Sequence, residues 1–217
     1  MKDLFVCATE LEMAPLRKKL AGRDDVELLV SGVGLVESAC SLSCFLAAAQ
    51  GKIRSIINFG IAGAYVGGNA GLLDICLAEK EVLGDLGLCF KDHIEPLGQG
   101  NITVRNSFPL ANPVLRQVEK IFNEKSIEFQ KGTFVTVNCV SASALRGDFL
   151  GRTHQALAEN MEGAAIARAC LHFDLPLVEL RCISNMVEDR DTSSWRLNEA
   201  CEKSAITAAC LAGNLFT

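Results

Sequence analysis

The chain has 217 residues, of which 49% are hydrophobic and 6% aromatic, and its formal net charge is -5. It carries no run of Lys and Arg, which argues against a nucleic-acid-binding surface or a patch for anionic membranes. No stretch approaches the roughly 18 consecutive apolar residues of a membrane span. The N-terminal apolar run meets Glu10 and Glu12 too early for a signal peptide. We therefore expect a cytoplasmic protein with no nucleic-acid partner and no membrane partner.

The ten cysteines fall at irregular spacings, and several lie in apolar, strand-like runs. At this chain length and apolar content, most are expected to be buried small side chains, and a disulfide framework is not expected. The sequence has no C-x-x-C pair, and its three histidines are His93, His154 and His172. A zinc site therefore has little support, and we expect no metal ion.

Short apolar runs alternate with helical patterns along the whole chain. The expected strands cover residues 4–8, 26–30, 55–59, 72–80, 81–88, 133–140, 156–161 and 176–183. The expected helices cover residues 11–20, 35–50, 112–125, 141–150 (a short helix or turn), a segment opening at 162, and 194–215, capped by Ser193 or Ser194. Such alternation is typical of an α/β domain whose sheet is covered on both faces. Without a linker or an internal repeat, residues 1–217 are expected to form one domain.

Polar residues that follow strands are the first candidates for a site, because ligands of α/β sheets bind at the carboxyl ends of strands. Glu12 follows the first strand and opens a helix, where it could also simply complement the helix dipole. The SGVG run, with Gly32 and Gly34, leaves backbone N–H groups free for an anion or a sugar oxygen. It lacks the third glycine of the dinucleotide-binding fingerprint, which disfavours a Rossmann oxidoreductase. The NFGIAGAYVGG run is expected to form a turn whose glycines let the backbone approach a ligand.

Two later stretches carry polar residues at predicted strand ends. In ENMEGAA, Glu162 stands where a strand turns into an alanine-rich helix, and both helix capping and ribose binding predict an acid there. In RCISN, an apolar strand delivers Ser184 and Asn185, and a charged segment, 188–191, follows as a lid or a solvated loop. A turn-forming role for Asn185 is the simpler alternative.

Taken in order, Glu12, SGVG, NFGIAGA, ENMEGAA and RCISN resemble the nucleoside phosphorylase and nucleosidase superfamily. The most similar subgroups are the methylthioadenosine/S-adenosylhomocysteine nucleosidases and the futalosine hydrolases. The resemblance implies a three-layer α/β sandwich with a mixed, twisted central sheet. It also implies a small-molecule nucleoside substrate, no cofactor, and a homodimer or larger homo-oligomer.

The resemblance also implies roles for individual residues. Glu12 matches the acid that activates the attacking water, Glu162 the acid that binds the ribose hydroxyls, and Met161 the methionine beneath the sugar. Further substrate contacts are implied at Asn160, Gly34, Ile61, Ala62, Gly63, Val140 and Ser184. Asn185 is implied as a catalytic residue, and it stands where adenine-specific nucleosidases carry an aspartate.

The asparagine at position 185 bears on the leaving base. A 6-oxopurine offers acceptors at O6 and N7, and an asparagine amide donates to such acceptors without a titrating proton. A site built this way disfavours a 6-amino purine, since two donors would face each other. Asn185 therefore indicates hypoxanthine or guanine as the leaving base. Among the similar subgroups, the futalosine hydrolases release hypoxanthine, so the resemblance implies futalosine hydrolysis in menaquinone biosynthesis as the activity.

Hydrolysis is favoured over phosphorolysis, because Glu12 would repel phosphate and the SGVG run carries no arginine. Three other readings stay open: a methylthioadenosine/S-adenosylhomocysteine nucleosidase, a purine-nucleoside phosphorylase, and a non-catalytic nucleoside-binding or storage protein. Two assignments also stay open. The purine could stack on one of three phenylalanines. The carboxylate of the benzoate-like tail of futalosine could bind one of three arginines. The candidates are Phe59, Phe90 and Phe134 for the first, and Arg105, Arg146 and Arg190 for the second.

Overall fold

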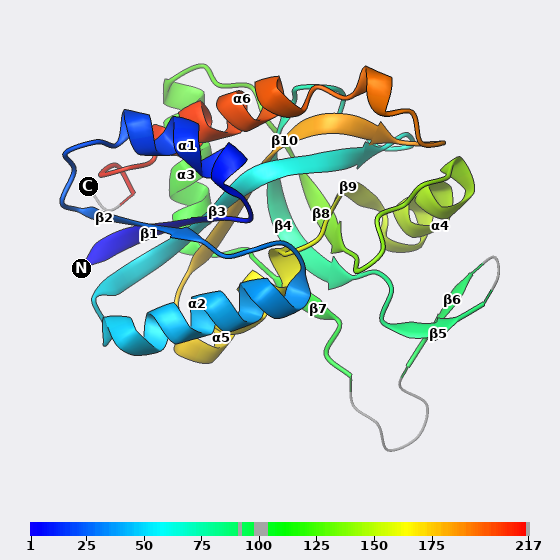
Figure 1. Ribbon diagram of the computed structural model, residues 1–217, viewed down its shortest axis with the longest axis horizontal. Helices are drawn as coiled ribbons and strands as arrows, with labels where there is room; N and C mark the ends of the chain where they lie inside the picture. The colour runs from blue at the N-terminus through cyan, green and yellow to red at the C-terminus, as the bar shows by residue number, and fades with distance from the viewer. Residues whose placement is uncertain (91–92, 98–103, 216–217) are drawn as a thin grey trace.

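The computed structural model describes residues 1–90, 93–97 and 104–215 (Figure 1). Its strands are β1 (Lys2–Cys7), β2 (Val26–Val30), β3 (Ile53–Tyr65), β4 (Ile75–Leu83), β5 (Gly87–Cys89), β6 (Ile94–Pro96), β7 (Ser107–Pro109), β8 (Gln130–Thr136), β9 (Ala156–Asn160) and β10 (Leu177–Val187). Its α-helices are α1 (Glu10–Lys19), α2 (Leu35–Ala49), α3 (Pro113–Glu124), α4 (Ala144–His154), α5 (Gly163–Phe173) and α6 (Leu197–Ala209). The alternation of strands and helices that the sequence predicts is thus confirmed.

The described residues form a mixed eight-stranded sheet in the order β10-β4-β8-β9-β3-β1-β2, with β7 paired to β4. The β1–β2, β1–β3, β3–β10, β4–β8 and β8–β9 pairs are parallel, whereas β3–β9 and β4–β10 are antiparallel. Because β10 also pairs with β3, the strands β3, β10, β4, β8 and β9 close into a ring. The expected three-layer sandwich is therefore not accurate, since part of the sheet is a closed barrel.

The barrel closes because β3 is long enough to pair with both β10 and β9. This strand is much longer than the sequence predicts. The expected strand ends at residue 59, but β3 continues to Tyr65, and β10 pairs with it from Ile56 onward. The last part of β3 then pairs with β9, where Gly63 lies opposite Glu159. The glycine turn predicted in NFGIAGAYVGG is confirmed only at its end, where the backbone N–H of Gly68 donates to the carbonyl of Tyr65 at 2.9 Å. Gly60 and Gly63 lie within β3 instead, where pairing with neighbouring strands on both sides keeps the backbone extended.

Helices cover the sheet on both sides (Figure 1). One hydrophobic core packs α1, α3 and α6 against the sheet, and a second core packs α2 and α5 against the other face. A smaller core holds Tyr65 and Leu150 between the barrel and α4. None of the helices in the described ranges has the length and apolar character needed to cross a bilayer.

Several local predictions are corrected by the structure. The expected strands at 72–80 and 81–88 are one strand, β4, followed by the short β5, and the sequence did not predict β6 or β7. The strand expected at 133–140 is β8, which ends at Thr136. The last helix begins at Leu197, after a 3-10 turn at Thr192–Ser194, and neither predicted serine caps it.

The cysteines are less buried than expected. Five of them are buried, namely Cys7, Cys76, Cys170, Cys182 and Cys201. Cys40, Cys44, Cys89 and Cys139 are exposed, and Cys210 is intermediate. The expectation that most cysteines are buried fails because Cys89 and Cys139 lie outside the main strands, and Cys40 and Cys44 are on the outer face of α2.

Candidate active site

A cavity of about 340 Å³ lies where the carboxyl ends of β1 and β9 meet β3 and β10. Ten of the residues that the sequence analysis singled out line it: Glu12, Ile61, Ala62, Gly63, Val140, Asn160, Met161, Glu162, Ser184 and Asn185. The eleventh, Gly34, reaches the same place through its backbone N–H, which donates to Glu162 Oε1 at 3.0 Å. Ile61 to Gly63 and the Ser184–Asn185 pair lie inside strands rather than after them, because β3 and β10 run past the cavity.

Glu12 is held rigidly at the cavity wall. Its Oε2 accepts hydrogen bonds from the backbone N–H of Thr9 at 2.9 Å and from Thr9 Oγ1 at 2.8 Å. The backbone N–H of Glu12 in turn donates to Thr9 Oγ1 at 3.4 Å, and the two backbone contacts form a capping box at the start of α1. Its Oε1 accepts from the backbone N–H of Ile61 at 3.1 Å. Glu12 therefore caps its helix and also presents a fixed carboxylate to the cavity.

Burial raises the pKa of Glu12, and the charge of Arg181 and the Thr9 hydrogen bond counteract part of that rise. The carboxyl lies against the backbone of Gly60, where any Cβ would collide with Glu12 Oε1. A carboxylate with a raised pKa in a cavity is suited to take a proton from water.

Glu162 occupies the N-cap position of α5, but its side chain makes no capping hydrogen bond. Asn160 performs that function, because its Oδ1 accepts from the backbone N–H groups of Glu162 at 2.9 Å and Gly163 at 2.7 Å. The Glu162 carboxylate is therefore free to face the cavity, where Gly34 contacts one oxygen and Arg181 Nη1 lies 3.6 Å from the other. The capping explanation for Glu162 is wrong.

Asn185 points its amide into the cavity from β10. Its Oδ1 accepts a hydrogen bond from Ser184 Oγ at 2.8 Å, and its Nδ2 donates to the backbone carbonyl of Met186 at 3.2 Å. Reversing the amide would place two acceptors together at the carbonyl, so these partners fix the orientation. One N–H of the amide remains for a ligand. A Cβ at Gly63 would lie 3.0 Å from Nδ2, which explains the glycine beneath it.

Sequence reasoning missed several buried charges. Arg181 lines the cavity although it is only 1% exposed, and its guanidinium donates to Glu179 Oε1 at 2.9 and 3.0 Å. Glu159 also lies in the wall, where it accepts from Ser141 and from the Tyr65 hydroxyl. The available signal was the charged residues in the otherwise apolar runs LVELRC and ALAEN.

The three candidate phenylalanines lie elsewhere. Phe59 and Phe134 are fully buried in the two main cores, and Phe90 stacks on His93 at 4.7 Å. Among the described residues of the wall, the one aromatic ring belongs to Trp195. The expected phenylalanine stack on the purine is therefore wrong.

The structure separates the three candidate arginines. Arg146 donates to Asp85 and to a backbone carbonyl, and Arg105 lines a different groove. Arg190 lines the cavity, with its guanidinium 4.8 Å from the centre of the Trp195 ring. The segment at 188–191 is tied to α4, since Asp189 accepts from the backbone N–H of the first residue of that helix at 2.9 Å.

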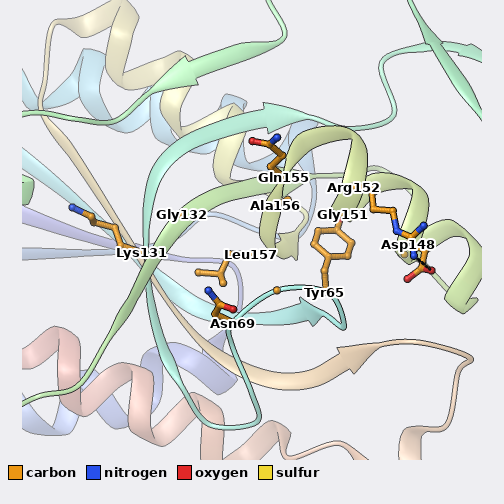
Figure 2. A pocket seen from close by; sticks show the side chains of 13 residues that line it. Tyr65, Asn69, Lys131, Gly132, Asp148, Gly151, Arg152, Gln155, Ala156 and Leu157 are labelled. Atoms are coloured by element: carbon orange, nitrogen blue, oxygen red, sulfur yellow. Dashed lines mark hydrogen bonds and ion pairs between the residues drawn. The ribbon is translucent and has the colours of Figure 1, made fainter.

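A second cavity, of about 520 Å³, opens beside α4 (Figure 2). Its charged side chains are already paired: Lys131 with Glu79 and Glu119, and Arg152 with Asp148. Across the described ranges, no group of three or more His, Cys, Asp or Glu side chains is arranged to hold a metal ion. The cavity around Glu12, Glu162 and Asn185 thus remains the candidate active site.

Comparisons with known proteins bear on the family and the fold. A profile of the phosphorylase superfamily matches residues 7–215. The futalosine hydrolase of Thermus thermophilus is 36% identical over 177 residues, covering 79% of this chain and 74% of the relative. The 5′-methylthioadenosine/S-adenosylhomocysteine nucleosidase of Buchnera aphidicola is 27% identical over 202 residues, covering 88% and 75%. A solved structure of futalosine hydrolase from Helicobacter pylori shares the fold, with a TM-score of 0.84 over 97% of each chain and 22% identity.

Proposed function

The chain belongs to the phosphorylase superfamily, and we propose that it is a nucleosidase that hydrolyses the N-glycosidic bond of futalosine, releasing hypoxanthine and leaving dehypoxanthine futalosine. The observation that carries the proposal is the meeting of two carboxylates and one oriented amide, from Glu12, Glu162 and Asn185, in one cavity. The similarity to a futalosine hydrolase over most of the chain supports it.

The proposed reaction begins with the sugar. Glu162 accepts hydrogen bonds from the ribose 2′- and 3′-hydroxyls, while Met161 lies beneath the ring. The glycosidic bond stretches until the sugar resembles an oxocarbenium ion, which the nearby carboxylates of Glu12 and Glu162 stabilise. The bonding electrons pass to the purine.

Water completes the reaction. Glu12 removes a proton from a water molecule as the water oxygen bonds to C1′, and the departing base takes up a proton from solvent. Arg181 favours the ionised form of Glu12 that this step needs, because its positive charge lowers the pKa of that carboxyl. General-base catalysis of this kind contributes typically ~10²–10⁴-fold to the rate.

The amide of Asn185 supports a 6-oxopurine as the leaving base. Its free N–H donates to the developing charge at O6 or N7 of hypoxanthine, while Ser184 and the Met186 carbonyl hold the group in that orientation. A 6-amino group would face this N–H with a second donor. The similarity to a methylthioadenosine nucleosidase makes an adenine nucleoside the second candidate.

The charges of the cavity favour water over phosphate. The SGVG run carries no arginine, but Arg181 lies in the wall of the cavity. Its charge is already matched by Glu179 at 2.9 Å and by Glu162 at 3.6 Å. A phosphate ion would also meet the carboxylate of Glu12, so phosphorolysis is disfavoured.

The aromatic carboxylate tail of futalosine would meet Arg190 and Trp195 at the cavity wall. Trp195 offers a ring face to the tail, and Arg190 offers a guanidinium that no carboxylate of the described chain holds in an ion pair. Guanidinium groups bind carboxylates with two parallel hydrogen bonds. This pair therefore provides the cation that the tail requires.

The proposal includes one nucleosidase domain, in the cytoplasm, acting as a homodimer or larger oligomer without a cofactor or metal ion. Futalosine turnover connects it to menaquinone biosynthesis. Light scattering of the purified protein tests the oligomeric state.

Chromatography of futalosine reactions run with and without phosphate tests the reaction type. The proposal expects the same rate of hypoxanthine release in both and a reducing sugar as the second product. A requirement for phosphate, with a sugar phosphate as product, would overturn the proposed role of Glu12.

A further inference from the structure

Two fully buried carboxyl groups meet just outside the cavity. Glu81 lies on β4 and Glu179 on β10, and both are 0% exposed. Both reach Gly163 at the start of α5, where a Cβ would collide with Glu81 Oε1 and lie 2.7 Å from Glu179 Oε1. Two ionised carboxylates facing each other without water would be very costly. Neither residue has a part in the reaction proposed above.

The hydrogen bonds identify which of the two carboxyl groups is ionised. Glu179 Oε1 accepts from Arg181 Nε at 3.0 Å, from Arg181 Nη2 at 2.9 Å and from Asn58 Nδ2 at 3.1 Å, as an ionised group does. The other oxygen, Oε2, is buried and has no N–H or hydroxyl donor in the described part of the chain. A proton on the facing carboxyl of Glu81 supplies the missing donor.

Electrostatics agrees with this assignment. Burial raises the pKa of Glu81 well above its ordinary value, and the charge of Glu179 raises it further. The hydrogen bonds from Thr136 and Asn160 and the charge of Arg181 act in the opposite direction but are smaller effects. These effects favour the neutral form of Glu81. Burial also raises the pKa of Glu179, but the charge of Arg181 and its hydrogen bonds counteract that rise.

Glu81 is connected to the site through two polar side chains. Its Oε1 accepts from Asn160 Nδ2 at 2.6 Å, and its Oε2 accepts from Thr136 Oγ1 at 2.7 Å. Asn160 in turn accepts from the backbone N–H of Glu162, and Thr136 accepts from the backbone N–H of Ala164. The first turn of α5, which carries Glu162, is thus attached to Glu81.

We propose that Glu81 and Glu179 share a single proton and together position the carboxylate of Glu162. Ionised Glu179 holds Arg181 beside that carboxylate. Neutral Glu81 holds Asn160, whose side chain fixes the backbone under Glu162. Both are positioning residues, and their effect on turnover rests on the proposed role of Glu162 in binding the ribose.

Infrared difference spectroscopy of the purified enzyme tests the shared proton without any substrate. The wild-type enzyme should show the carbonyl stretch of a protonated carboxyl group at neutral pH. The band should vanish in Glu81→Gln and persist in Glu10→Gln, which changes an exposed acid on α1. A wild-type spectrum without the band, or a band that survives Glu81→Gln, would overturn the assignment.

Kinetics with futalosine and its 2′-deoxy analogue test the positioning role. Glu81→Gln keeps one carbonyl oxygen as an acceptor and places an N–H donor where the acid carries its proton, so its kcat/KM should stay within about threefold of wild type. Glu81→Ala should reduce the ratio of kcat/KM for the ribose substrate over the 2′-deoxy analogue by about tenfold, the effect of ~1.4 kcal/mol less binding to the hydroxyl. A purely structural role would lower kcat/KM equally for both substrates and leave their ratio unchanged. That outcome would contradict the proposal.

The two arms separate the possible failures. If wild-type enzyme releases no base from futalosine, the proposed function fails, and the infrared arm still decides whether the proton is shared. If wild-type enzyme is active but Glu81→Gln loses as much activity as Glu81→Ala, the proposed function stands and the neutral state of Glu81 is refuted.

Discussion

The backbone N–H of Gly34 donates a hydrogen bond to Glu162 Oε1 at 3.0 Å, across 128 positions of sequence. Gly34 ends the loop after β2 and has a φ of 88°, a conformation that glycine adopts readily. Glu162 precedes α5, and its backbone is fixed independently by Asn160. The contact therefore fixes the carboxylate from a second side, so that it faces the cavity rather than its own helix.

Replacing Glu12 with Gln should abolish turnover but not binding. The amide keeps the size of the side chain and cannot take a proton from water, so kcat should fall by ~10²–10⁴-fold. Equilibrium binding of futalosine, measured by calorimetry, should remain. Glu10→Gln is the matched control, because Glu10 lies in the same helical turn, 67% exposed and paired with Arg17. Full activity of Glu12→Gln would refute the general-base assignment.

Replacing Thr9 with Val should move the acid limb of the pH profile upward. Burial already raises the pKa of Glu12, so kcat/KM should fall as pH falls through that raised value, where the base becomes protonated. The Thr9 hydroxyl stabilises the ionised form at 2.8 Å, so its loss should raise the pKa further. The profile of kcat/KM against pH measures this, with the exposed Thr153→Val as control. An acid limb that stays in place or moves to lower pH would be inconsistent with the geometry.

Replacing Asn185 with Asp should shift the preference toward adenine. An acid can donate to N7 without facing the 6-amino group with a fixed N–H, whereas it loses the contact that favours a 6-oxo group. Each buried hydrogen-bond mismatch costs ~1–3 kcal/mol, so the ratio of kcat/KM for the two bases should change by roughly 5- to 150-fold. The exposed Asn123→Asp on α3 serves as control. An unchanged ratio would remove the argument that Asn185 selects the base.

Replacing Arg190 with Gln should weaken recognition of the tail alone. One hydrogen bond to a charged group contributes ~1.5 kcal/mol, so kcat/KM for futalosine should fall about tenfold. The methyl ester of futalosine has no charge on its tail, so the wild-type enzyme and Arg190→Gln should cleave it equally. Arg17→Gln, which changes a surface ion pair on α1, is the control. An equal loss on acid and ester would show that Arg190 does not bind the carboxylate.

The sequence predicts most of the site because its residues follow apolar strands. Glu12, Glu162 and Asn185 each come after or late in such a strand. Parallel pairing with β3 brings the carboxyl ends of β1 and β10 to one edge, which accounts for Glu12 and Asn185. β9 runs antiparallel to β3, so the position of Glu162 depends on closure of the barrel. The length and the pairing of these strands are harder to predict from the sequence. The glycines of NFGIAGAYVGG suggest a turn, but pairing of β3 with β10 and β9 keeps Gly60 and Gly63 extended, and the turn begins only after Tyr65. Closure of the barrel depends on that pairing, which no local pattern reveals.

The network of buried charged side chains was also not predicted from the sequence. Glu179 and Arg181 are charged residues in the apolar strand β10, and Glu81 follows Glu79 and Lys80 in β4. Charged residues in such strands usually face solvent. Their partners lie on other strands: Asn160 for Glu81 and Asn58 for Glu179. Glu179 and Arg181 pair within β10 itself, but only the register of the sheet places Glu81 beside them in the interior.

Competition between futalosine and its 6-amino counterpart in one reaction tests the central claim most directly. The two nucleosides share the sugar and the tail and differ only at position 6 of the purine, so the ratio of hypoxanthine to adenine released, read by chromatography, isolates recognition of the base. The proposed function predicts hypoxanthine in large excess, without added phosphate. Adenine in equal or greater amount would contradict the assignment of a 6-oxopurine substrate and of Asn185 as the residue that selects it.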